Sequence, residues 1–159
     1  MWMTYTLYSK VLEAEETINI LMPHPHQVTT GAYTKPDLYE NRRKLPVLIA
    51  MGDEGTESNW WVRHSFAEGD IQTKVAAIVC VRGMPATQKG ISFLEEELPI
   101  LLCAQFPMDA TRIAFLGWER SSIFTELIKG KQYRFLITGE HTDCVKAMQG
   151  ALTRLIEEE

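Results

Sequence analysis

The sequence lacks the features that mark several classes of protein. Its 159 residues hold only three cysteines, Cys80, Cys103 and Cys144, and this odd number with wide spacing predicts neither a disulfide framework nor a zinc site. No apolar run approaches the roughly 18 residues that a membrane-spanning helix needs, and the first ten residues lack the basic and apolar segments of a signal peptide. We therefore expect a reduced, cytoplasmic protein with no membrane partner.

Charge of one sign is not in large excess either. The chain has 21 acidic and 16 basic residues, a formal net charge of −5, whereas nucleic-acid-binding domains are usually basic. The sequence has no internal repeat or low-complexity segment, and 45% of its residues are hydrophobic. These values predict a single globular domain over residues 1–159, with no nucleic-acid partner.

Six short runs of apolar and β-branched residues are typical of strands. The acidic segment 12–16 separates the first two runs, which predicts an antiparallel pair joined by a turn. The later runs are almost entirely apolar, as in strands that are covered on both faces of a parallel sheet. The six predicted strands are 4–8, 17–22, 45–52, 74–83, 112–118 and 132–139.

Helical patterns lie between and after the predicted strands. The clearest amphipathic stretch contains Pro99, which predicts a kink or a late helix start there. Its acidic residues 95–97 are interpreted as a solvated helix face. The predicted helices are 60–68, 91–106, 121–128 and 142–158.

Buried strands that alternate with helices predict an α/β fold. We expect a three-layer α/β/α sandwich around a mostly parallel sheet of about six strands, with an antiparallel N-terminal edge. Ligands of such folds meet the carboxyl ends of the strands. The segments that follow predicted strands are therefore the candidate site: 53–59, 82–85, 118–122 and 140–144.

Four segments resemble the esterase D and tributyrin-esterase branch of the α/β-hydrolases. They are LYSKVLEAEETINILMP at 7–23, KLPVLIAMGDEGTESNWW at 44–61, FLEEELPILLCAQFPMDATRIAFLGW at 93–118 and TGEHTD at 138–143. The resemblance implies a reduced α/β-hydrolase-like fold, a small ester or acyl ligand and no cofactor. It has a gap in the second half of the chain.

The nucleophile elbow of these enzymes has the pattern G-x-S-x-G. The corresponding residues here are 117–121, so Glu119 occupies the nucleophile position and Ser121 the position of the last glycine. A carboxylate at that position cannot replace the serine hydroxyl. Ser121 and Ser122 are interpreted as the cap and first turn of the next helix.

The oxyanion loop also departs from the pattern that the resemblance implies. Met51 and Gly52 stand where the family has His-Gly, and Arg120 follows the nucleophile position. Acidic side chains at 53, 54 and 57 follow this pair, and negative charge there opposes the developing charge of an oxyanion.

His141 matches the family's general-base position, and Asp143 is a poor substitute for the acid that precedes it in the family. The segment between Ser122 and His141 is too short for the elements that normally carry that acid. In a rival alignment Asp143 belongs to the acid-bearing loop and no histidine follows it. In either alignment Glu119, His141 and Asp143 form a degenerate catalytic set.

Other residues have both functional and structural interpretations. His24 and His26 could bind a metal with a third ligand, but a surface loop is favoured and no metal site is expected. Cys144 could form a nucleophilic pair with His141, although a structural thiol is favoured. Glu119 and Arg120 could pair with each other, and one of two adjacent tryptophans, 60 and 61, is expected to pack on the sheet.

Besides a regulatory or interaction domain that keeps only the scaffold, the sequence leaves two functions open. The first is a pseudo-esterase that keeps the fold for binding or assembly without ester hydrolysis. The second is a carboxylic-ester hydrolase with a non-standard catalytic set around His141, using Ser121, Ser122 or Cys144. The missing elements of the second half predict an uncovered apolar edge or face and therefore self-association into a homo-oligomer.

Overall fold

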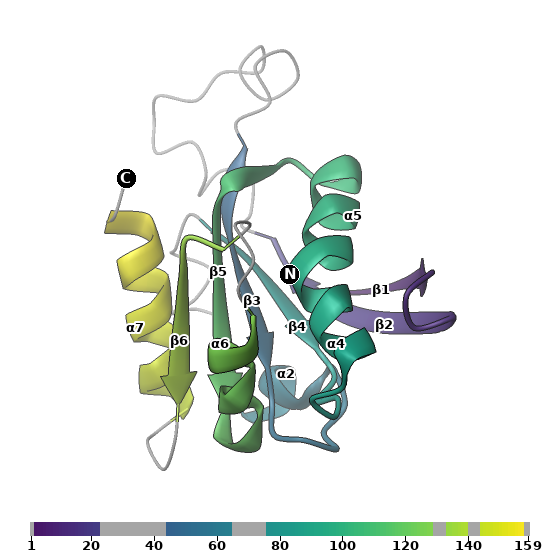
Figure 1. The fold of residues 1–159 in the computed structure, drawn as a ribbon. Coiled ribbons are helices and arrows are strands. Elements are labelled where there is room, and N and C mark those ends of the chain that lie inside the picture. The colour runs from purple at the N-terminus through teal and green to yellow at the C-terminus, as the bar shows by residue number, and fades with distance from the viewer. Residues whose placement is uncertain (1, 23–43, 65–75, 129–132, 140–143, 158–159) are drawn as a thin grey trace.

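The computed structural model describes residues 2–22, 44–64, 76–128, 133–139 and 144–157. They form one six-stranded sheet in the order β1-β2-β4-β3-β5-β6 (Figure 1). β3, β4, β5 and β6 are mutually parallel, whereas β1 and β2 form an antiparallel hairpin that pairs with β4 through β2. The strands are β1 (Trp2–Ser9), β2 (Ala14–Leu21), β3 (Leu45–Met51), β4 (Ala77–Val81), β5 (Met108–Trp118) and β6 (Phe135–Gly139).

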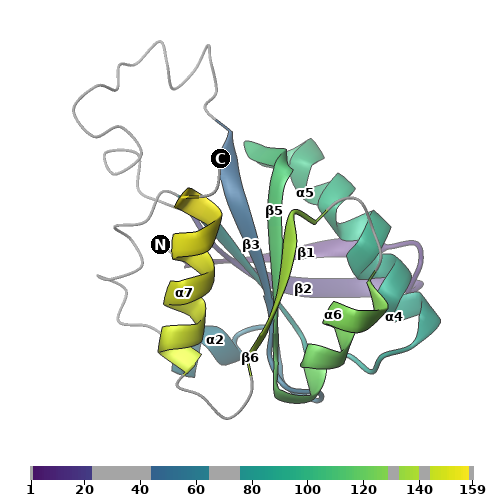
Figure 2. The same cartoon turned by 60° about the vertical axis from the view of Figure 1, so that its left-hand side comes forward.

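Helices cover both faces of the sheet, which confirms the predicted three-layer sandwich with an antiparallel N-terminal edge. Figure 2 shows α2 and α7 on one face and α4, α5 and α6 on the other. The helical elements are α2 (Trp60–His64), α4 (Gln88–Ser92), the π-helical segment η2 (Phe93–Glu97), α5 (Leu98–Gln105), the 3₁₀ helix η3 (Glu119–Ile123), α6 (Phe124–Leu127) and α7 (Cys144–Glu157).

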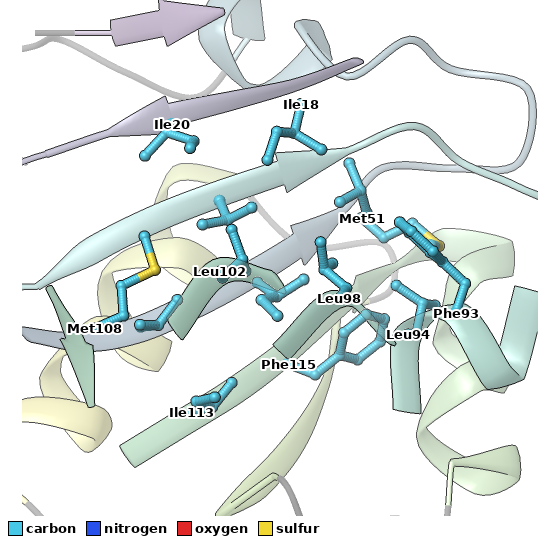
Figure 3. Close-up of a cluster of buried hydrophobic side chains, with 14 of the residues drawn as sticks. Ile18, Ile20, Met51, Phe93, Leu94, Leu98, Leu102, Met108, Ile113 and Phe115 are labelled. Carbon is cyan, nitrogen blue, oxygen red and sulfur yellow. The ribbon is translucent and has the colours of Figure 1, made fainter. Parts of the chain in front are cut away.

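The sheet separates two hydrophobic cores. Successive side chains of β3 point to opposite faces, so Val47, Ile49 and Met51 join the core under α4 and α5 while Leu48 and Ala50 join the core under α7. Every residue of β3 is buried, as expected for a central strand that is covered on both faces. Figure 3 shows how the helical layer, with Phe93, Leu94, Leu98 and Leu102, lies on the strand side chains Ile18, Ile20, Met51, Met108, Ile113 and Phe115.

The amphipathic stretch around Pro99 forms one helical path through α4, η2 and α5. Pro99 lies in the first turn of α5, but the helical path already begins at Gln88, so the predicted late helix start at Pro99 is wrong. The preceding residues stay helical because the backbone N–H of Leu98 bonds to the carbonyl of Phe93, five residues back. Proline has no N–H to donate, and the wider π-turn accommodates it without ending the helix.

Glu97 on this path fastens the tip of the β1–β2 hairpin. Its carboxylate accepts hydrogen bonds from the Ser9 hydroxyl, from the Lys10 backbone N–H at 2.8 Å and from the Val11 N–H at 3.3 Å. The interpretation of Glu95, Glu96 and Glu97 as a solvated face is therefore wrong for Glu97. The bonds span more than 80 residues of sequence, so the helical period alone could not reveal them.

The C-terminal helix α7 buries one stripe of apolar side chains against the sheet. Met148, Leu152 and Leu155 are fully buried against the sheet. Arg112 of β5 reaches the end of this helix, where its Nη2 donates to the carbonyls of Leu155 at 3.2 Å and Ile156 at 3.4 Å. A cation at a helix C-terminus interacts favourably with the helix dipole. None of the described helices has the length and apolar character needed to cross a membrane.

Candidate functional site

The loops that follow β3 and β4 are joined at the carboxyl edge of the sheet. Gly55 donates its N–H to the carbonyl of Gly83 at 2.8 Å, and Gly83 donates to the carbonyl of Thr56 at 2.9 Å. A Cβ atom on Gly83 would lie 1.9 Å from the backbone oxygen of Asp53. Only glycine allows the two loops to approach this closely.

The turn after β5, residues 117–121 and below called the elbow, leads sharply from the strand into a helical segment. Glu119 adopts a left-handed conformation with φ of 56°, and the chain then enters the 3₁₀ helix η3. A Cβ atom on Gly117 would lie 2.5 Å from the carbonyl oxygen of Ser121, so the return of the chain requires glycine at that position. The sharp strand-to-helix turn is therefore present, and Glu119 stands at its strained position.

Ser121 joins the elbow to the loop after β3. Its side chain is buried, and its hydroxyl donates to the carbonyl of Gly52 at 2.5 Å. Neither Ser121 nor Ser122 is the expected cap, because the N-cap of η3 is Trp118. Both serines lie inside this helical turn, which agrees with the other part of the expectation. The prediction of a serine cap is wrong because the helical turn begins two residues before Ser121, at Glu119.

Asp53 is the central acceptor between the two loops. Its Oδ1 accepts from the backbone N–H of Glu54 at 2.8 Å, from the backbone N–H of Arg120 at 3.1 Å and from Nε of Arg120 at 3.0 Å. Arg120 also donates to the backbone carbonyl of Glu54 at 3.1 Å and lies 3.5 Å from its carboxylate. The structure thus gives Arg120 two partners, Asp53 and Glu54, other than the one suggested from sequence.

These contacts set the charge state of Asp53. Partial burial raises the pKa of its carboxyl, but hydrogen bonds from the Arg120 side chain, the Arg120 backbone and the Glu54 backbone lower it, as does the positive charge of Arg120. The second group of effects is larger, so the pKa lies below its ordinary value of 3.8. Asp53 is therefore ionised at neutral pH and holds Arg120 across the loop.

Comparison with known proteins gives structural matches and no sequence matches. No protein-family model matches the chain, and no curated protein matches it by sequence. The fluorophosphonate-binding serine hydrolase F of Staphylococcus aureus superposes with a TM-score of 0.65 at 11% identity, over 86% of this chain and 55% of that one. An S-formylglutathione hydrolase of Agrobacterium tumefaciens gives a TM-score of 0.62 at 13% identity, over 87% of this chain and 57% of that one.

A ferulic acid esterase of Anaeromyces mucronatus has the same arrangement, with a TM-score of 0.58 and 16% identity over 80% of this chain. The chain has an α/β-hydrolase-like fold. The resemblance drawn from the sequence segments is thereby confirmed at the level of the fold. The chain spans only 52% to 57% of the length of these three enzymes.

Four of the residues singled out from sequence, Met51, Gly52, Glu119 and Arg120, lie where β3 and β5 end at the carboxyl edge of the sheet. Met51 ends β3 and Gly52 follows it, and both residues are buried. Cys144 begins α7 and is half-buried. His141 and Asp143 lie outside the described residues, as do His24 and His26. Within the described ranges, no three His, Cys, Asp or Glu side chains are grouped so as to hold a metal ion.

Three tryptophans pack together behind the elbow. The rings of Trp60 and Trp61 have centroids 5.0 Å apart, and Trp118 lies 5.9 Å from Trp61 and 6.4 Å from Trp60. Trp61 is fully buried, which confirms that one of the adjacent pair packs on the sheet. The sequence analysis placed Trp118 in the elbow and did not predict its contact with the other two tryptophans. That contact depends on the order of the strands in the sheet, which no local sequence pattern reveals.

Proposed function

We propose that this chain is a pseudo-esterase, which uses an α/β-hydrolase-like fold for binding or assembly and does not hydrolyse carboxylic esters. The observation that carries the proposal is the position of the Asp53 carboxylate. In α/β-hydrolases the oxyanion hole combines the backbone N–H of the residue after the nucleophile with an N–H from the loop after the third strand. We take the backbone N–H groups of Arg120 and Glu54 as the counterparts of these two groups, because they belong to the turn after β5 and the loop after β3 and both donate to Asp53 Oδ1.

A carboxylate oxygen on these two N–H groups competes with a substrate oxyanion. Stabilisation of the developing oxyanion is commonly the largest electrostatic contribution to acyl transfer. Asp53 carries a full negative charge and is held there by the Arg120 guanidinium as well. A tetrahedral intermediate would have to displace a bound internal anion before it gained any stabilisation.

The nucleophile position supports the same proposal. Glu119 offers no hydroxyl or thiol for attack, and the hydroxyl of the nearby Ser121 is buried and donates to Gly52. Attack by a carboxylate on an ester would give a mixed anhydride, which is not a productive acyl-enzyme in this chemistry. We therefore propose that the protein has neither a nucleophile at this position nor an open oxyanion hole.

The test is hydrolysis of 4-nitrophenyl acetate and butyrate by purified protein. We expect the same background rate from the native chain, from Glu119→Gln and from His141→Ala. A rate above background that disappears in His141→Ala would instead support the alternative, a hydrolase built around His141 with Ser121, Ser122 or Cys144.

A second test uses variants that restore the missing groups. The double variant Asp53→Gly/Glu119→Ser introduces a serine and removes the carboxylate that binds the two N–H groups, whereas in Glu119→Ser alone Asp53 still occupies them. Only the double variant is expected to gain measurable turnover.

We also propose that the assembly role uses the β6 edge of the sheet. β6 lies at one end of the strand order, and in the described part of the chain its pairing partner is β5. Leu136 and Ile137 on this strand are only half-buried. Light scattering at high micromolar concentration is expected to give an oligomer that Thr138→Lys converts to a monomer, because a charged side chain on an edge strand opposes strand pairing. A native monomer would contradict this proposal.

A further inference from the structure

A pocket of about 480 Å³ lies beside the elbow, between the β1–β2 hairpin and the loops after β3 and β4. Its volume falls within the usual range of small-molecule sites, roughly 300–1,000 Å³. Glu15, Thr17 and Asn19 alternate along β2 and therefore point to the same face of the hairpin, toward the pocket. Glu57 and Arg82 line it from the loops.

The walls of this pocket are fixed by hydrogen bonds between side chains. The Ser58 hydroxyl donates to Oδ1 of Asn19 at 2.7 Å, and Nδ2 of Asn19 donates to the Thr4 hydroxyl at 3.2 Å. On the other side, Nε of Arg82 donates to both carboxylate oxygens of Glu16, at 2.7 and 3.1 Å. The loop after β3 is thus tied to the hairpin independently of the elbow.

Buried polar side chains are concentrated here. The buried polar residues of the described chain are Ser9, Glu16, Asn19, Ser58 and Ser121, and three of these, Glu16, Asn19 and Ser58, line the pocket. Burying polar groups costs free energy unless they are bonded, so they are uncommon inside proteins. Their presence on both sides of the pocket gives it polar walls, which suit a polar occupant rather than an acyl chain.

The charge of the pocket is unbalanced toward the negative. Three carboxylates line it against one guanidinium, and that guanidinium is already paired with Glu16. Glu15 and Glu57 approach from different walls, and neither side chain has an ion-pair partner among the residues that the structure describes. A ligand that neutralises both carboxylates would be stabilised by electrostatic attraction and by hydroxyl acceptors of the wall.

We propose that this pocket binds a small organic cation with primary ammonium groups. Ammonium groups donate three hydrogen bonds and accept none, which matches walls of carboxylate, hydroxyl and amide oxygens. The site lies apart from the elbow contacts of Asp53 and Arg120, so it stands whether or not the chain hydrolyses esters. The absence of ester hydrolysis would therefore leave this proposal unaffected.

The experiment is a titration of the full chain followed by amide chemical shifts. Three four-carbon probes are compared: 1,4-diaminobutane, the uncharged 1,4-butanediol and the anionic succinate. Saturable shifts are expected only with the diamine, at the backbone amides of Glu57, Ser58, Arg82 and Gly83. The dissociation constant is expected to rise with added salt, because the attraction is between partly exposed charges.

Charge-neutralising variants locate the site. Glu15→Gln and Glu57→Gln keep the side-chain size, and each is expected to weaken diamine binding about two- to fivefold. The double variant is expected to lose about tenfold. Glu96→Gln is the matched control, since it removes one exposed carboxylate on η2, outside the pocket, and it should bind as the native chain does.

Three results would overturn the proposal. The first is a diamine response no larger than the diol response. The second is equal weakening in Glu96→Gln and Glu57→Gln, which would reveal only general charge attraction. The third is a set of shifted amides away from the pocket. Unchanged urea midpoints of the two single variants would establish that any loss of binding is not a loss of folding.

Discussion

The two halves of the loop after β3 differ in how their charges are satisfied. Residues 52–54 meet the elbow and form a closed network, in which Arg120 contacts two carboxylates and Ser121 bonds to Gly52. Residues 55–59 face the hairpin and line an open pocket, where Glu57 has no ion-pair partner in the described chain. A single loop therefore takes part in a closed network beside the turn after β5 and lines an open pocket beside the hairpin.

This difference shows that acidic residues close together in one loop have different roles. Sequence reasoning grouped Asp53, Glu54 and Glu57 as charges that oppose an oxyanion. The first two share the single guanidinium of Arg120, which joins the loop after β3 to the turn after β5. Glu57 keeps its negative charge toward solvent and the pocket. The predictions below separate the two regions experimentally, starting with the residue on which both depend.

Gly83 supports both regions, so Gly83→Ala should have the largest effect. Its new methyl group would overlap the Asp53 carbonyl and push the two loops apart. We expect a loss of about 3 kcal/mol in the free energy of unfolding, measured with urea. Gly150→Ala in α7 is the control: nothing lies near that position, and it should stabilise the helix by up to about 1 kcal/mol. Equal effects of the two variants would mean that the loops are not tightly joined.

Ser121→Ala tests the closed half alone. The substitution leaves the buried carbonyl of Gly52 without its donor, and we expect a loss of about 1–3 kcal/mol in unfolding free energy. Thr111→Ala removes an exposed hydroxyl that bonds to Asp109 and should cost less than about 1 kcal/mol. Diamine binding in the pocket should be unchanged in Ser121→Ala. A loss of diamine binding in this variant would show that the closed network and the pocket are energetically coupled, which contradicts our description of them as separate.

Glu97→Gln tests the open half from the opposite side of the hairpin. It weakens the bonds to Ser9, Lys10 and Val11, and we expect a loss of about 1 kcal/mol in unfolding free energy. Glu96→Gln, one residue away and exposed, should leave stability within about 0.5 kcal/mol of the native value. Urea unfolding of the two variants in parallel gives the comparison. No difference between them would show that Glu97 does not hold the hairpin.

Asp53→Asn has an expected effect no larger than that of Glu97→Gln, and this effect depends on pH. The pKa of Asp53 is lowered in the folded chain, so its carboxylate adds stability above the ordinary value of 3.8 and loses it as pH falls through the folded pKa. At pH 7 we expect the variant to be less stable by about 1 kcal/mol, the scale of a backbone hydrogen bond. The difference from the native chain should shrink below about pH 4. A constant difference from pH 7 to pH 3 would contradict the assigned contacts.

Much of the fold follows from short-range patterns. The apolar runs of β3, β4 and β5 identify buried parallel strands because each is covered on both faces. The stripe of α7 likewise predicts its buried side. The sequence period does not reveal the π-turn before Pro99, since that turn depends on a single missing N–H within an otherwise regular helical pattern.

The candidate site was less accessible from sequence. The resemblance predicts that Glu119 occupies the nucleophile position, but no local pattern predicts the left-handed backbone that Glu119 adopts. The bond from the Arg120 N–H to Asp53 joins residues 67 positions apart and depends on how two loops close over Gly83. The pocket needs Asn19 and Ser58 together, and these come from a strand and a loop that no local pattern relates.

The left-handed turn at Glu119 has a consequence for engineering. A residue with a side chain is strained there by roughly 1–2 kcal/mol, whereas glycine adopts the same angles freely. The chain thus carries strain at a position that does not form its core and that a single glycine would relieve. The elbow fixes the direction of the side chain at position 119 beside the loops, so a different side chain placed there would take the same direction. The rest of the fold already compensates for the strain of this turn.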